Sequence, residues 1–90
     1  AEHQWRFIKA AIAHATTDDD LGHIAAGPME HLLGRHGDDF IDQIEEFAAS
    51  NSKFAKMMTG VWKHMTSDQV WGRVEAIQAA CPDKLGGNPD

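Results

Sequence analysis

The sequence of 90 residues contains one cysteine, no tyrosine and no long apolar run. The single thiol, Cys81, excludes an internal disulfide and a zinc site built from several cysteines. Scarce cysteine is typical of a reducing compartment. The sequence shows neither a signal-peptide pattern nor the roughly 20 consecutive apolar residues of a membrane span. We therefore expect a cytoplasmic protein that does not interact with membranes.

Basic residues are also scarce, since eight Lys and Arg stand against fourteen Asp and Glu and give a net charge of -6. The imbalance lies in residues 1–50, which carry ten acidic and three basic side chains, whereas residues 51–90 carry four and five. Because nucleic-acid phosphates bind basic surfaces, no direct contact with nucleic acid is expected. A protein partner with a basic surface fits this charge better.

Apolar residues recur with the 3.6-residue period of amphipathic helices along nearly the whole chain, and no segment keeps the two-residue period of a strand. The side chains expected to face inward are Trp5, Ile8, Ala11, Ile12, Ala15, Phe40, Ile41, Ile44, Phe47, Ala48, Phe54, Met57, Met58, Val61, Trp62, Val70, Trp71, Val74, Ile77 and Cys81. We predict an all-α fold, a compact bundle or short stack of five to six helices joined by tight turns. Residues 1–82 form its single domain, and residues 83–90 a flexible C-terminal tail.

One helix boundary is predicted at Gly27 and Pro28. Glycine suits an N-cap and proline the first helical position, so a short helix over residues 21–26 should end there and another should begin at Pro28. Glu30 then stands at the third helical position, where its carboxylate can reach the free backbone N–H groups.

The other boundaries follow from similar signals. Gly34 or Gly37 should close the helix that begins at Pro28. The predicted caps are the run Thr16–Asp20, Asp38 or Asp39, Asn51 or Ser52, and the pair Thr66 and Gln69, with Pro82 ending the last helix.

Four short motifs resemble those of a bacterial family of small, uncharacterised all-helical domains with the hallmark Ala-Gly-Pro-Leu-Glu-x-Leu-Leu. They read Ala26-Gly27-Pro28-Met29-Glu30-His31-Leu32-Leu33, His36-Gly37, Asp39-Phe40-Ile41-Asp42 and Gly60-Val61-Trp62. Met29 replaces the usual leucine, and His31 replaces a usual acidic residue. The resemblance implies a helical fold whose structural hallmark residues are Gly27, Pro28, Glu30, Gly37 and Trp62. It implies no activity.

The most prominent surface charge expected from the sequence is an acidic group formed by Asp38, Asp39, Asp42, Glu45 and Glu46. Asp39, Asp42 and Glu46 are spaced to share one side of a helix whose other side is apolar, although like charges this close destabilise a helix. One interpretation is a solvated face whose first carboxylates also stabilise the helix N-terminus. The other is an acidic surface that docks on a basic partner.

The six histidines and Glu30 raise the question of a metal or acid–base site. The histidines are His3, His14, His23, His31, His36 and His64. No two of them have the i, i+3 or i, i+4 spacing of helical metal ligands. Glu30 and His31 are neighbours and diverge by about 100° on a helix. We therefore expect exposed or capping histidines, and no metal or cofactor.

The leading hypothesis is a non-catalytic protein-binding module. A small acidic helical domain fits an inhibitor or antagonist in bacterial conflict, of the immunity or anti-defence type, acting through the acidic helix face. One alternative is a metal-dependent or acid–base enzyme that uses Glu30 and nearby histidines. Another is a structural module of a longer protein, since the sequence begins at Ala1 and not at Met.

Overall fold

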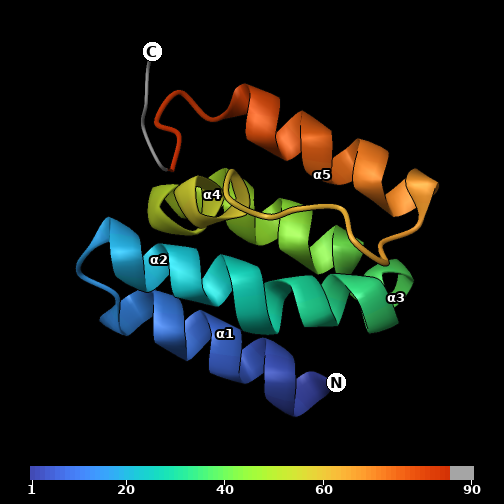
Figure 1. Cartoon of the computed structure of the whole chain (residues 1–90), viewed down its shortest axis with the longest axis horizontal. Helices are drawn as coiled ribbons and strands as arrows, with labels where there is room; N and C mark the ends of the chain where they lie inside the picture. Colours follow the sequence, from blue (N-terminus) through green and yellow to red (C-terminus); the bar gives the residue numbers. More distant parts are fainter. Residues whose placement is uncertain (86–90) are drawn as a thin grey trace.

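Helices occupy most of the chain in the computed structural model, which describes residues 1–85. Their order is α1 (Glu2–His14), α2 (Asp18–Ile24), the π-helical turn η1 (Ala25–Met29), α3 (Glu30–Ser50), α4 (Ser52–Met58) and α5 (Asp68–Ala80). Residues 1–85 contain no strand, so the predicted all-α class is confirmed. Figure 1 shows α1 at the bottom, then the row formed by α2 and the first part of α3, then α4 with the second part of α3, and α5 at the top. The fold measures 32 × 25 × 23 Å.

An aromatic cluster forms the centre of the core and joins α1, α3 and α4. The Trp5 ring lies 6.1 Å from that of Phe40, 6.0 Å from Phe47 and 5.7 Å from Phe54, measured between centroids. Phe47 and Phe54 are 4.8 Å apart. Tilted and edge-on pairs at these distances stabilise a core beyond the area that they bury. The inward stripes predicted for α1 and α3 are therefore correct.

The predicted helix break at Gly27 and Pro28 is wrong. α2 continues through η1 into α3, and Pro28 lies inside the helical run. The π turn, in which hydrogen bonds span one residue more than in an α-helix, accommodates the missing N–H of proline. The count of five to six helices is wrong for the same reason, because residues 1–85 form four separate helices: α1, the α2–η1–α3 run, α4 and α5.

The boundary predicted between Gly34 or Gly37 and Asp38 or Asp39 coincides with a break inside α3, at which two helical segments meet. α3 runs through all four residues with one kink at His36, whose φ is -136° and ψ is 22°. A Cβ atom on Gly37 would lie 3.1 Å from Val70 Cγ1, tighter than most real contacts of a Cβ atom. Glycine at position 37 therefore permits the close approach of α3 and α5.

The helix caps are partly as predicted. Asp20 N donates to Thr17 Oγ1 and Phe54 N donates to Asn51 Oδ1, which confirms the caps of α2 and α4. The capping box of Thr66 and Gln69 is wrong, because Ser67 caps α5 by accepting from Val70 N. Thr66 is instead buried, and its Oγ1 has no hydrogen-bond partner.

The chain after α5 folds back along α4. Leu85 N donates to Thr59 Oγ1 at 2.6 Å, and Lys84 Nζ donates to the carbonyl oxygens of Gln78 and Cys81. Residues 83–85 of the predicted tail thus contact the helices, and its residues 86–90 lie outside the described part of the chain. None of the helices in residues 1–85 has the length and apolar character that crossing a membrane requires.

Candidate functional site

The predicted acidic group lies on α3 with most of its carboxylates in solvent. Asp38, Asp39, Asp42 and Glu46 are exposed, and Glu45 is half-buried. The opposite side of the helix is buried in the core through Phe40, Ile41 and Ile44. Among residues 1–85, no salt bridge reaches Asp38, Asp39 or Glu46. We call these three residues and Asp42 the acidic face.

Arg73 of α5 neutralises one edge of the acidic group. Its Nε and one terminal nitrogen donate to Glu45 at 2.8 and 2.5 Å, and the same terminal nitrogen donates to Asp42 at 2.6 Å. The hydrogen bond from Arg73 lowers the pKa of Glu45, and the two carboxylates raise the pKa of Arg73. A bidentate guanidinium–carboxylate pair also fixes α5 against α3. The sequence analysis did not anticipate this pair, because the partners are 28 and 31 residues apart.

A second surface, which we call the 62–65 loop, exposes two large apolar side chains between α4 and α5. Trp62 is 72% exposed and Met65 is 85% exposed. Trp62 was expected to continue the inward stripe of α4, and that prediction is wrong. α4 ends at Met58, and turn hydrogen bonds at residues 59–61 replace the helical pattern, so the stripe stops at Val61.

The carboxylate of Glu30 fixes the backbone and one side chain of the 62–65 loop. Its Oε2 accepts from Trp62 N at 2.8 Å, and its Oε1 lies 3.3 Å from His64 Nε2. The Glu30 side chain is 11% exposed. His64 has a φ of 43°, a left-handed conformation that costs energy in a residue other than glycine. The prediction that Glu30 caps its own helix is therefore wrong. Its carboxylate instead fixes a strained loop 32 residues further along the chain.

The structure separates the histidines that the enzyme alternative would combine. His31 Nδ1 lies 3.0 Å from Gln4 Nε2 of α1, whereas Glu30 approaches His64. Within residues 1–85, no three His, Cys, Asp or Glu side chains are placed to hold a metal ion. The contact between Glu30 and His64 is the one carboxylate–imidazole pair among the salt bridges of the described residues.

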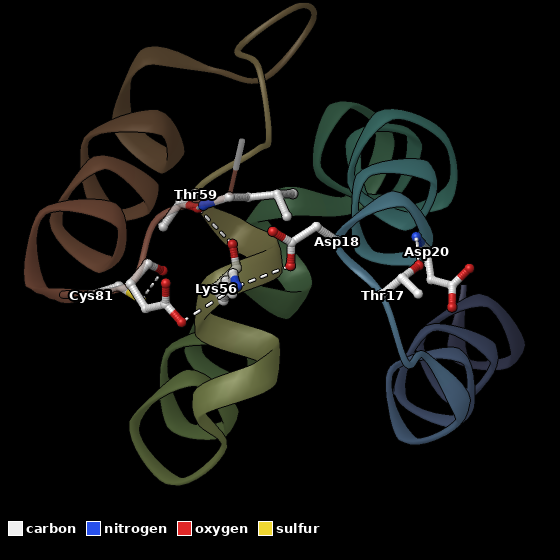
Figure 2. Close-up of polar contacts among 8 residues, drawn as sticks. Thr17, Asp18, Asp20, Lys56, Thr59 and Cys81 are labelled. Carbon is white, nitrogen blue, oxygen red and sulfur yellow. Dashed lines mark hydrogen bonds and ion pairs between the residues drawn. The ribbon is translucent and has the colours of Figure 1, made fainter. Parts of the chain in front are cut away.

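Lys56 joins three segments at the opposite end of the molecule (Figure 2). Its Nζ lies 3.0 Å from Asp18 Oδ1 at the start of α2 and 3.4 Å from Asp83 Oδ2 after α5. The hydrogen bond to Asp18 is the main cause of a raised pKa for Lys56, so the amine stays charged. Thr59 Oγ1 donates to the Lys56 carbonyl and accepts from Leu85 N. This arrangement ties the start of α2 and the segment after α5 to α4.

The run Asp18–Asp20 serves the start of α2, in agreement with the capping interpretation. Thr16 N donates to Asp20 Oδ2 at 3.0 Å while Asp20 N donates to Thr17 Oγ1 at 3.1 Å. The first of these hydrogen bonds lowers the pKa of Asp20. Asp18 is engaged by Lys56, as described above.

A groove of about 630 Å³ lies between α3, α4 and α5. Alanines form much of its lining, with Cys81 and Pro82 at one end and the pair of Glu45 and Arg73 at the other. Cys81 is 7% exposed, and its thiol donates to the Asp83 carbonyl. The thiol is therefore part of the packing, as predicted.

Residues 1–81 match a family of unknown function, DUF6869, and the chain belongs to this family. The match confirms the expectation of an uncharacterised family and covers all the predicted hallmark residues, Gly27, Pro28, Glu30, Gly37 and Trp62. Neither a curated protein nor a solved structure matches the chain. The surfaces described above therefore carry the functional argument.

Proposed function

We propose that this member of a family of unknown function is a non-catalytic protein-binding module that recognises a basic protein through the acidic face. The observation that carries the proposal is the exposure of Asp38, Asp39 and Glu46 without a salt bridge in the described structure. Several like charges on one helix cost stability, and a basic partner would offset this cost. The net charge of -6 also attracts a basic partner, over longer distances than the acidic face alone.

Arg73 gives the members of the acidic group two different roles, because it pairs with only two of them. Glu45 and Asp42 stabilise the packing of α3 on α5, while Asp39 and Glu46 remain available to a partner. A partner with Lys or Arg side chains would be steered toward the acidic face before contact. An inhibitor or antagonist acting in bacterial conflict in the cytoplasm, of the immunity or anti-defence type, is the biological role that we assign to such a module.

The test reverses two charges of the acidic face and leaves the Arg73 pair intact. The partner is first identified by cross-linking in cells from a photoreactive residue at Gln43, which is exposed beside Asp39 and Glu46. The association rate of the purified partner is then measured against salt for the wild type and for Asp39→Lys/Glu46→Lys. We expect slower association and a weaker salt dependence for the variant, because exposed charges act over about 8 Å at physiological ionic strength.

The control variant is Glu2→Lys/Glu75→Lys, which changes the net charge equally at exposed positions of α1 and α5. A decrease in rate confined to the acidic-face variant supports the proposal. Equal rates for the two variants, or association that does not respond to salt, would show that the acidic face is only solvated.

A further inference from the structure

The 62–65 loop combines two properties that solvent-exposed loops rarely share. The side chains of Trp62 and Met65 are 72% and 85% exposed, and the loop backbone is fixed by a hydrogen bond to the Glu30 side chain. Trp62 N and His64 Nε2 both contact the Glu30 carboxylate, which is itself mostly buried. Exposed apolar side chains on a fixed backbone lose little conformational entropy on binding, and tryptophan dominates many protein interfaces.

The loop also adjoins the acidic face. Met65 lies over Gly34, where an added Cβ atom would be 3.3 Å from Met65 Cβ. Asp38 lies four residues after Gly34, just beyond the kink at His36, and Asp39 and Asp42 continue the acidic face along the second segment of α3. An apolar anchor beside a charged rim is the usual arrangement of a binding hot spot.

We propose that Trp62 and Met65 form the apolar anchor with which this protein docks on its basic partner, whose surface carries an apolar pocket beside its positive charges. This inference rests on the proposed function and adds the chemistry of the partner's pocket. Charge complementarity favours a basic partner over a second copy of this chain, because two copies would bring their acidic faces together.

Two cationic peptides serve as the probe. Both are amphipathic helices with lysines on one face, and the other face carries leucine in the first peptide and alanine in the second. We expect the wild-type protein to bind the leucine peptide on the order of tenfold more tightly, because only this peptide offers an apolar surface for Trp62. Titration calorimetry measures both affinities.

The variant Trp62→Ser/Met65→Ser should bind both peptides equally. Phe7→Ser is the matched control, since Phe7 is an apolar side chain 61% exposed on α1, and it should keep the preference for leucine. Circular dichroism checks that each variant folds. Retention of the preference in Trp62→Ser/Met65→Ser, or an equal loss in Phe7→Ser, would overturn the anchor.

The same titration measures the contribution of the acidic face to peptide affinity separately. If Asp39→Lys/Glu46→Lys lowers the affinity for both peptides equally while the loop variant has no effect, the proposed function is supported and the apolar anchor is refuted. If the acidic-face variant binds both peptides as the wild type does, the proposed function falls. Self-association of the wild type in sedimentation, lost in the loop variant, would assign the loop to a second copy and overturn the proposal.

Discussion

Replacing Glu30 by alanine tests how the structure uses this mostly buried carboxylate. The change removes the acceptor for Trp62 N and the group beside His64 Nε2. A hydrogen bond to a charged group contributes about 1.5–3 kcal/mol, and water can partly replace it at this exposed backbone N–H. We therefore expect a loss of about 1–2 kcal/mol in the free energy of unfolding, or roughly 4–8 °C in melting temperature for each kcal/mol.

Urea denaturation followed by circular dichroism gives the stability, and amide hydrogen exchange locates the change. Faster exchange at Trp62 is expected in Glu30→Ala, and Glu30→Gln should lose less stability because its amide oxygen still accepts from Trp62 N. Glu46→Ala, on the same helix but exposed, should stay within about 0.5 kcal/mol of the wild type. Unchanged exchange at Trp62, with faster exchange at the start of α3 instead, would refute the loop contact and restore the capping interpretation.

Three further predictions concern the helices and the ion pair. Gly27→Ala should raise the unfolding free energy by about 0.5–1 kcal/mol in urea denaturation, because Gly27 is helical with open space around it; destabilisation would contradict the continuous helix. Thr66→Val should stabilise by about 1 kcal/mol in the same assay, because it removes a buried hydroxyl without a partner, whereas a true N-cap would lose stability. The lowered pKa of Glu45 means that its contribution is present above the ordinary value of 4.5 and lost as pH falls through the folded-state pKa. Arg73→Met should therefore flatten the acid limb of a plot of melting temperature against pH, and an unchanged limb would show that the pair does not stabilise the fold.

The fold class was predictable because its signals are local. The stripe containing Trp5, Ile8 and Ile12 predicts the buried side of α1, and the side chain of Asn51 predicts the start of α4. The acidic face was predictable for the same reason, since residues three and four apart on a helix are neighbours. The spacing of the acidic residues does not determine whether they bind a partner, so that function is our proposal.

The errors occurred where a local signal had more than one solution. Glycine followed by proline is typical of a helix start, but a π turn satisfies the same two residues inside a continuous helix. Gly34 and Gly37 were interpreted as helix ends, and the helix does break at His36 between them, but both glycines also allow Met65 and Val70 to approach α3 closely. A glycine is selected by backbone conformation or by crowding, and only the tertiary contacts distinguish the two.

The amino-acid sequence by itself determined the helical periodicity, most of the inward-facing side chains and the excess of acid on α3, because each depends on residues within about one or two turns. Tertiary structure alone decided that Arg73 pairs with Glu45, that Glu30 holds the 62–65 loop and that Trp62 points into solvent. These contacts join residues about 30 positions apart, and their geometry follows from how the helices cross. No local pattern encodes that crossing, which is why the Arg73 pair, the Glu30 contact and the exposure of Trp62 became visible only in the folded chain.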